Sequence, residues 1–345
     1  MSLVQVDIVI PHFNGLGLLQ ACLASLARQQ QVSCRIVVVD NGSTDGSVTW
    51  LEENSDVDAV FLAENTGFAA AVNAGIRRCS APLVLLLNND TELAPDTLFL
   101  LVQEAGSRPG YGFYVPKMLN LQRPHILDGA GDAYLRGGAG YRLGTMEPDC
   151  DFYNRPGPVF GGCGGATLYR REIFARTGLF DEDFFAYLED VDLNLRMNRM
   201  GIGGYYVPAA RVYHVGSATS GSRINSFTVR LSTRNSLYIL AKHYCVSLLI
   251  RLLPVICIYQ LCWLFFCIKK GQGLAWLQGA AQALTHLPAQ RRKHHLLTGS
   301  DSLTRSEFAL LLKKAEEEVV TSIMHRREGQ GKGVSLLRLY RFLFL

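Results

Sequence analysis

Three short apolar runs, each closed by polar residues that favour turns, constrain the fold of this chain more than any other feature. They span Val6 to Ile10, Arg35 to Val39 and Leu83 to Leu87. Runs of this length, rich in Val, Ile and Leu, are typical of strands buried on both faces of a parallel sheet. Between the first two runs, apolar residues recur at helical spacing over residues 18–26. The pattern predicts an α/β fold with an open, wound mixed sheet flanked by helices.

The alternation of strands and helices continues less regularly over the first 230 residues. Strands are expected over residues 60–62 and 205–214, and helices over 69–78, over 170–176 and up to about residue 200. Residues 106–166 are rich in Gly, Pro and Tyr without clear periodicity, so we expect loops and short strands there. Near the C-terminus, Thr304 and Glu307 have the spacing of a capping box that begins an amphipathic helix.

Charge and cysteine content limit the class of partner and the compartment. The formal net charge is only +4, and Lys and Arg are spread thinly until the last third of the chain, so nucleic acid is not indicated as a partner. Basic clusters at residues 269–270 and 291–293 flank apolar stretches, which favours attraction to anionic lipid headgroups. The nine cysteines form no CxxC pair, and the N-terminus lacks the pattern of a secretory signal. A reducing, cytoplasmic setting is therefore expected.

The segment from Leu252 to Ile268 contains no charged residue over 17 positions. That length lies at the lower limit for crossing a bilayer. Pro254 near its start makes a shallow or re-entrant helix as consistent with the pattern as a full crossing. A helix buried in the protein core is a third interpretation, which the flanking lysine pair and Trp263 and Trp276 disfavour.

Polar residues that could bind a ligand follow two of the predicted strands. Asp90 ends the triplet Asn88-Asn89-Asp90 directly after the strand at 83–87, at the sheet edge where ligands bind in such folds. Its carboxylate suits Mg²⁺ or Mn²⁺, although a turn that caps the next helix is equally consistent. Asp40 also ends a strand, where it could accept a hydrogen bond from a ribose hydroxyl or a pyrimidine N–H, or begin a turn.

A dinucleotide-binding fold is a rival interpretation, because it also places an acidic residue at the end of the second strand. That fold requires the glycine pattern GxGxxG after the first strand. This chain has Gly15 and Gly17 but Gln20 at the third position. A nicotinamide-dependent oxidoreductase is therefore only a minor alternative.

The densest acidic segment covers residues 180–192, where carboxylates alternate with aromatic residues. Glu189 and Asp190 open a predicted helix, whose exposed amides favour their negative charge. A carboxylate in this place could equally act as a general base toward a hydroxyl. His214 ends a predicted strand, and a lone histidine is more often structural than a metal ligand.

Taken in order, these segments resemble the inverting glycosyltransferases of family 2, which have the GT-A fold, and within them the rhamnosyltransferase-like branch. The resemblance extends over roughly residues 6 to 240. It is carried by Val6–Pro11 with Asn14, Val38–Ser47, Asn65–Ala69 with Asn73 and Gly75, Leu87–Asp90, Gly161–Gly165, Phe180–Glu182, Glu189–Leu193, Val207-Pro208 and Tyr213-His214. Any one segment is a weak signal, but chance agreement of so many in this order is improbable.

The resemblance implies a donor pocket, a metal site and a catalytic base. The donor pocket would be lined by Pro11, Asn14, Asp40, Asn41, Asn65, Gly67, Asn73, Asn88 and Asn89. Asp90 and His214 would hold Mg²⁺ or Mn²⁺, and Asp90 is the only carboxylate left in a triplet that usually has two. Asp190 corresponds to the family's catalytic base, with Glu189 beside it.

The resemblance also implies which part of the chain has which function. A catalytic domain would cover residues 1–230, with its nucleotide-binding half up to about residue 105 and its acceptor-binding half after it. A helical extension over 231–345 would hold the protein, as a peripheral or monotopic one, on the cytoplasmic face of the cell membrane. A homo-oligomer is compatible with the sequence.

The activity implied is metal-dependent sugar transfer with inversion, for the synthesis of cell-surface polysaccharide. The donor would be a nucleoside-diphosphate sugar, dTDP-rhamnose first or else a UDP-hexose, and the acceptor a saccharide or lipid-linked saccharide. A nucleotide-sugar-binding protein without turnover is the alternative, because the metal triplet lacks a carboxylate.

Overall fold

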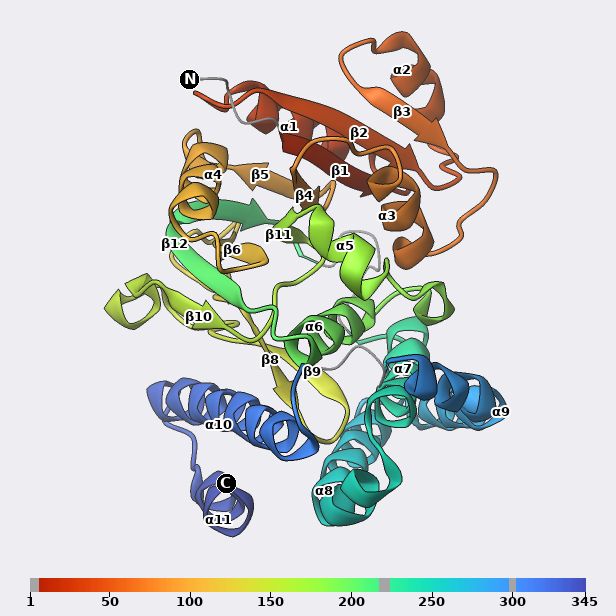
Figure 1. Ribbon diagram of the computed structural model, residues 1–345, viewed down its shortest axis with the longest axis vertical. Helices are drawn as coiled ribbons and strands as arrows, with labels where there is room; N and C mark the ends of the chain where they lie inside the picture. Colours follow the sequence, from red (N-terminus) through yellow and green to blue (C-terminus); the bar gives the residue numbers. More distant parts are fainter. Residues whose placement is uncertain (1–5, 217–223, 298–301) are drawn as a thin grey trace. The chain divides into compact units, whose positions relative to one another are not determined.

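The computed structural model describes residues 6–216, 224–297 and 302–345. The chain forms two compact units that are interleaved in sequence (Figure 1). The first consists of Met1–Asp132, Gly144–Phe185 and Ile202–Gly221, and the second of Ala133–Leu143, Ala186–Gly201 and Ser222–Leu345. How function is divided along the chain stays a prediction.

The first unit is built on one mixed sheet, as the sequence predicts. Its strands follow the order β10 (Gly157–Val159), β12 (Gly204–His214), β6 (Phe113–Asn120), β11 (Ala166–Arg170), β4 (Leu83–Leu87), β1 (Val6–His12), β2 (Cys34–Asp40) and β3 (Asp58–Phe61). The strands β4, β1, β2 and β3 run parallel to one another, whereas β11 runs antiparallel to both β4 and β6. Two short strands lie off this path: β5 (Thr91–Leu93) pairs with β12, and β7 (Leu127–Gly129) pairs with β6.

Helices cover both faces of this sheet because the side chains of each strand alternate between the faces. On one face, Ile8 and Ile10 of β1 pack in the main core with α1 (Leu16–Ala27) and α4 (Thr97–Ser107). On the other face, β2 residues pack against α3 (Phe68–Ile76). There Gly75 must be glycine, since an added Cβ would lie 2.3 Å from Cγ1 of Val9. Two shorter helices, α2 (Ser47–Glu53) and α5 (Glu172–Thr177), complete the first unit.

The stretch expected to hold loops and short strands contains one long central strand as well. The eight residues of β6 pair with β11 and β12 despite Pro116 and the buried Lys117. Pro116 pairs with Val207, directly before a register shift in β12 between Val207 and Arg211, and such an irregularity is a place where a sheet tolerates proline. Lys117 is buried as an ion pair with Asp149 at 2.7 Å.

Over the described residues, the second unit contains a two-stranded sheet and six helices. Its elements are β8 (Asp132–Leu135), which begins at the boundary of the units, β9 (Ala139–Arg142), α6 (Glu189–Arg199), α7 (Ser226–His243), α8 (Val246–Lys269), α9 (Gly273–Leu297), α10 (Arg305–Gly329) and α11 (Ser335–Phe344). The apolar segment predicted at 252–268 lies within the longer α8, and Pro254 stays inside the helix. In the described part of the chain, α8 is the one helix long and apolar enough to cross a membrane, and most of it is not buried.

The C-terminal helices are anchored by a buried ion pair. The predicted capping box is confirmed, with Thr304 and Glu307 each accepting from the other's backbone amide at the start of α10. Further along α10, the buried Glu316 accepts from the guanidinium and the backbone amide of Arg136, between β8 and β9. Both side chains are almost fully buried, so each charge depends on the other.

Candidate functional site

The carboxyl ends of β4, β1 and β2 bring several predicted site residues to one edge of the sheet. His12 and Asp40 are paired across β1 and β2, and Asn88 to Asp90 follow β4, which pairs with the other side of β1. In a parallel sheet such an edge is open to ligands, since the chain leaves each strand there in a loop. Pro11 pairs with Val39 at the same edge.

The two carboxylate oxygens of Asp40 have different surroundings. The side chain is fully buried, and its Oδ1 accepts from the amides of Gly42 and Ser43 at 3.2 and 3.0 Å. Its Oδ2 has no hydrogen-bond partner among the described residues. Buried carboxylate oxygens are nearly always hydrogen-bonded, so Oδ2 is available to a donor group of a ligand.

Three of the predicted donor-site asparagines shape the loops around this edge. Asn14 accepts from the Thr44 amide through Oδ1 at 2.8 Å. Asn41 accepts from the Thr66 amide at 2.9 Å and donates to Oδ1 of Asn65 at 3.1 Å. These bonds join the loops after β1, β2 and β3, so the asparagines hold the walls of the edge.

Gly67, at the N-terminus of α3, packs closely against Phe185, which lies inside the acidic segment. Its backbone has φ of 90° and ψ of 166°, a conformation that is essentially restricted to glycine. An added Cβ would lie 2.6 Å from the Phe185 carbonyl oxygen, to which the Ala69 amide donates at 3.2 Å. Only glycine allows this approach.

Asn73 of α3 fixes the same segment from a second point. Its Oδ1 accepts from the Phe180 amide at 2.9 Å, and its Nδ2 donates to the Phe180 carbonyl at 2.9 Å and to Glu182 at 2.8 Å. The side chain is buried. The contacts of Asn73 therefore hold residues 180–182 in place. They explain why the side chain is buried there without a direct contact to the sugar donor.

His12 belongs to this edge, although no motif in the sequence indicated it. Its Nδ1 lies 2.8 Å from Nδ2 of Asn89, an amide that can only donate, so Nε2 carries the proton and donates to Oγ of Ser47 at 2.8 Å. Burial lowers the pKa of His12 despite the charges of Asp40 and Asp45. The position directly after Pro11, at the end of β1, is the signal that could have identified it.

Asp90 and His214 are brought together by the pairing of β5 with β12. His214 pairs with Thr91, and the Val215 amide donates to the Asp90 carbonyl at 3.0 Å. Nε2 of His214 then lies 3.2 Å from Oδ1 of Asp90, and both side chains are buried. The helix-cap alternative for Asp90 is wrong, because α4 begins after Asp96 without a side-chain cap.

The other ring nitrogen of His214 faces a second carboxylate. Nδ1 lies 2.9 Å from Oδ2 of Asp128, which is buried in β7. Burial lowers the pKa of His214, but the hydrogen bonds and charges of Asp128 and Asp90 outweigh it and raise the value to about 9. Nothing in the sequence marks Asp128, because its three-residue strand lies in the stretch without periodicity.

These residues fit a hard divalent cation that has few protein ligands. Asp90 offers an oxygen, and His214 would offer Nε2 once the cation displaces the proton that the two carboxylates hold there. Asp128 would fix the imidazole with Nε2 directed at the ion. Among the described residues, no group of three or more His, Cys, Asp and Glu side chains forms a complete metal site. The remaining ligands would have to come from substrate phosphates and water.

Glu189 and Asp190 lie in the first turn of a helix, as predicted, and this helix, α6, belongs to the second unit. Burial and then the charge of Asp190 hold the pKa of Glu189 well above its usual range, and Oε2 of Glu189 has no partner among the described residues. Asp190 is more exposed. The neutral form is therefore favoured for Glu189, which leaves Asp190 as the accessible carboxylate.

Asp192, two residues further along α6, has a structural role. It is fully buried and accepts from Arg196, Lys242 and His243 at 2.9, 2.7 and 2.9 Å. Burial raises its pKa, but these neighbours outweigh it and hold the pKa well below its usual range. The bonds to Lys242 and His243 tie α6 to α7, so Asp192 is occupied by the protein.

Known proteins share both the sequence pattern and the fold. A family model described as glycosyl transferase family 2 matches residues 7–178. The chain is 28% identical to N-acetylglucosaminyl-diphospho-decaprenol L-rhamnosyltransferase of Mycobacterium tuberculosis, over 59% of this chain and 73% of that protein. It is 30% identical to an N-acetylglucosaminyltransferase of Rhizobium sp., over 60% of this chain and 47% of that protein.

Two solved structures share the fold at low sequence identity. GalNAc-T7 with UDP, GalNAc and Mn²⁺ matches with a TM-score of 0.59 and 17% identity, over 71% of this chain and 49% of that one. The mannosyltransferase PcManGT from Pyrobaculum calidifontis, with GDP-Man and Mn²⁺, matches with a TM-score of 0.50 and 16% identity, over 92% and 86%. The GT-A type of sheet expected from the sequence is confirmed.

Proposed function

Because the chain belongs to glycosyltransferase family 2, we propose that it moves a sugar from a nucleoside-diphosphate donor to an acceptor hydroxyl with inversion at the anomeric carbon. One observation carries this proposal: the buried pair of Asp90 and His214 lies at the sheet edge where one carboxylate oxygen of Asp40 finds no hydrogen-bond partner in the part of the chain that the structure describes. A nucleoside diphosphate has a diphosphate at one end, which a metal on Asp90 and His214 would bind. At its other end it has a base, whose N–H could donate to Asp40. Family membership sets aside the nicotinamide-dependent alternative.

In this proposal the donor nucleotide lies along the edge formed by β1, β2 and β4. Oδ2 of Asp40 accepts from the base or ribose, while Asn14, Asn41 and Asn65 keep the surrounding loops in place. Gly67 and Asn73 act on the same site by positioning residues 180–185. Pro11, Asn88 and Asn89 complete the walls.

Asp90 and His214 would hold Mg²⁺ or Mn²⁺, which neutralises charge on the departing diphosphate. The two solved structures of this fold contain Mn²⁺, which supports a divalent cation here. Because Asn88 replaces a carboxylate, the protein supplies few ligands. Metal binding is then expected to be weak until donor phosphates join the coordination shell.

Asp190 is the proposed general base. Its carboxylate removes the proton of the acceptor hydroxyl as the hydroxyl oxygen bonds to the anomeric carbon. The bond between that carbon and the diphosphate oxygen breaks on the opposite face, so the configuration inverts. Glu189, buried beside Asp190, favours its neutral form and so limits the number of charges at this helix start.

The acceptor is proposed to be a lipid-linked saccharide, and the first choice of donor is dTDP-rhamnose, with UDP-hexoses as the alternative. The mycobacterial relative is named for rhamnosyl transfer to a decaprenyl-linked saccharide. The exposed apolar residues of α8, among them Ile250, Leu261 and Phe265, fit a place on the inner face of the membrane.

Nucleotide-sugar screening and a base variant test this proposal together. Thermal shift with dTDP-rhamnose and UDP-hexoses, each with Mg²⁺ or Mn²⁺, should reveal one stabilising donor. Asp190→Asn should then lower the rate of transfer by about 100-fold or more while donor binding is retained. Asp183→Asn, an exposed change in the same acidic segment, is the matched control and should keep full activity.

Tight metal-dependent donor binding by a wild-type protein without turnover would show a binding protein instead of an enzyme. If no nucleotide sugar stabilised the protein, the proposed donor site would be contradicted. Tight binding of Mn²⁺ to the donor-free protein in calorimetry would contradict the weak two-ligand site.

A further inference from the structure

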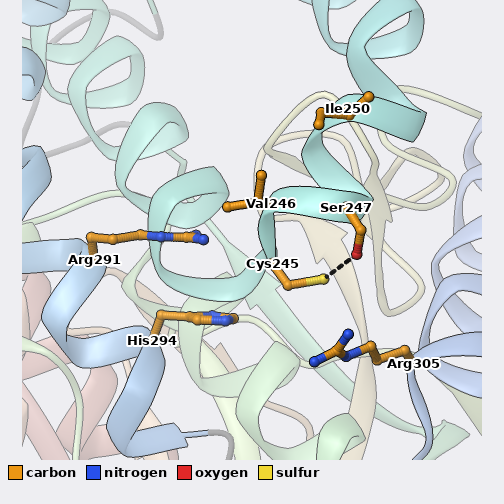
Figure 2. Close-up of a pocket in the computed structure, with 7 residues that line it drawn as sticks. All are labelled: Cys245, Val246, Ser247, Ile250, Arg291, His294 and Arg305. Carbon is orange, nitrogen blue, oxygen red and sulfur yellow. Dashed lines mark hydrogen bonds between the residues drawn. The ribbon is translucent and has the colours of Figure 1, made fainter.

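A cavity of about 590 Å³ lies in the second unit, where α8 begins. Its described lining comes from three helices: Cys245 to Ser247 with Ile250 at the start of α8, Arg291 and His294 of α9, and Arg305 at the first position of α10 (Figure 2). None of the residues proposed for sugar transfer lines it. The cavity is therefore a second candidate for ligand binding.

The polar part of this cavity carries positive charge. Arg291 and Arg305 are permanently charged, and no carboxylate belongs to the described lining. Arg291 is held by the carbonyls of Ala241 and Tyr244, and the buried His294 is held by the carbonyl of Lys242 at 2.9 Å from Nδ1. These bonds fix the α9 side of the cavity.

Arg305 differs from Arg291 because it is exposed and forms no hydrogen bond or ion pair with a described residue. Its guanidinium points toward the cavity from the side opposite α9 (Figure 2). An arginine with an unused planar set of donors suits a phosphate group, which accepts two parallel hydrogen bonds.

The start of α8 adds to this positive field. Cys245 is the N-cap of this 24-residue helix, and the exposed amides of a first turn favour an anion. Burial raises the pKa of the Cys245 thiol, but Ser247, the Leu248 amide and the charge of Arg305 outweigh it and lower the pKa. A negative charge is therefore stabilised at the wall of the cavity.

The other part of the cavity is apolar and open to solvent. Val246 and Ile250 are 60% and 70% exposed. The apolar surface continues along α8 through Leu253 and Leu261, which are 55% and 63% exposed. Positive groups lie at the start of this helix, and an apolar surface continues along it. This combination suits a ligand that carries both a phosphate group and a hydrocarbon chain.

We propose that this cavity binds a phosphate group, with Arg305 and Arg291 as its cationic ligands. The phosphate comes either from a lipid, whose acyl or prenyl chain then follows the apolar face of α8, or from a soluble phosphate ester. None of the proposed catalytic residues lines this site, so a test of phosphate binding here does not depend on whether the protein transfers sugar.

Charge reversal at Arg305 tests the site without disturbing the fold. Arg305→Glu places an acidic residue in the first turn of α10, where it is favourable for the helix. Lys314→Glu is the matched control, because it makes the same charge change at an exposed position of the same helix. Circular dichroism and thermal unfolding of the full chain in detergent should show both variants folded.

Binding is measured to vesicles of phosphatidylcholine with and without phosphatidic acid, and to inorganic phosphate and glycerol 3-phosphate by calorimetry. Arg305→Glu should weaken binding to the phosphate-bearing probe by about tenfold, the usual effect of one charge-assisted hydrogen bond, and Lys314→Glu should not. Loss confined to phosphatidic acid vesicles identifies a lipid as the source, and loss confined to the soluble probes identifies a free phosphate ester.

Equal losses in Arg305→Glu and Lys314→Glu would reduce the effect to general surface charge and overturn the site. So would a folded wild type that binds neither probe. Donor-dependent thermal shift, measured on the same preparations, should be unchanged in both variants, and it reports separately on the proposed sugar transfer.

Discussion

Replacing Gly67 with alanine tests whether the close contact between α3 and Phe185, in the acidic segment, holds the donor site together. Gly67 has φ of 90° and ψ of 166°, and an alanine Cβ would meet the Phe185 carbonyl oxygen at 2.6 Å and its ring at 2.7 Å. Gly46 is a matched control. It also has a positive φ, 88°, but an added Cβ would meet nothing within 4 Å.

The two substitutions are expected to lower the stability of the protein by different amounts, for a physical reason. Alanine at Gly46, in the left-handed helical region, costs about 1–2 kcal/mol of stability. At Gly67 the backbone region is less favourable and costs about 1–3 kcal/mol. Displacing the Phe185 backbone adds about 1–3 kcal/mol of overpacking. Gly67→Ala should therefore destabilise the protein by about 2–3 kcal/mol more than Gly46→Ala.

Urea denaturation gives the free energies of unfolding, and donor-dependent thermal shift gives the effect on the site. Gly67→Ala should weaken donor binding, because residues 180–185 are displaced, while Gly46→Ala should leave it close to wild type. Equal unfolding free energies for the two variants, or unchanged donor affinity in a clearly destabilised Gly67→Ala protein, would refute the role given to this contact.

Three further predictions concern charged groups. Asp128→Asn should weaken metal-dependent donor binding by about 10–100-fold, measured by calorimetry with Mn²⁺, because His214 loses the carboxylate that orients it. Burial first, and then the charges of Lys242 and Arg199, lower the pKa of His243 to about 4 in the folded protein against 6.5 unfolded. The folded state therefore binds fewer protons, so stability should fall by about 3 kcal/mol as pH drops from 6.5 to 4, and urea titrations of His243→Gln should show a weaker dependence. Glu316→Ala should cost about 3–5 kcal/mol by leaving its buried arginine partner unpaired, whereas Glu317→Ala breaks only an exposed pair and should cost under about 1 kcal/mol in the same denaturation assay.

The strands of the parallel half could be predicted from sequence because nothing but apolar packing determines them. The run at 83–87 is β4 to the residue, since all five side chains are buried. The strand β6 could not be predicted, because Pro116 and Lys117 interrupt its apolar pattern. A register shift in β12 and the ion pair with Asp149 make these two residues acceptable there, and neither is visible in a local stretch of sequence.

The residues of the candidate site also divide into those that a local stretch of sequence reveals and those that only distant contacts reveal. Asp40 and Asp90 could be selected because each directly follows an obvious strand. Asp128 could not, because its partner His214 lies 86 residues away and only the pairing of β6 with β7 and β12 joins them. The asparagines selected as donor contacts have a role that sequence does not distinguish from ligand binding, since the same side chain hydrogen-bonds a loop or a substrate equally well.

The interleaving of the two compact units has a consequence for how the chain is made. Helix α6 leaves the ribosome about 50 residues before Lys242 and His243, which neutralise its buried Asp192. During synthesis this acidic helix start must stay hydrated or be protected until α7 emerges. A gene fragment that stops near residue 221 would hold every residue of the first unit, yet would leave α6 and the hairpin of β8 and β9 as unpartnered insertions within it. Aggregation of such a fragment would then report on the missing helices and not on any weakness of the sheet.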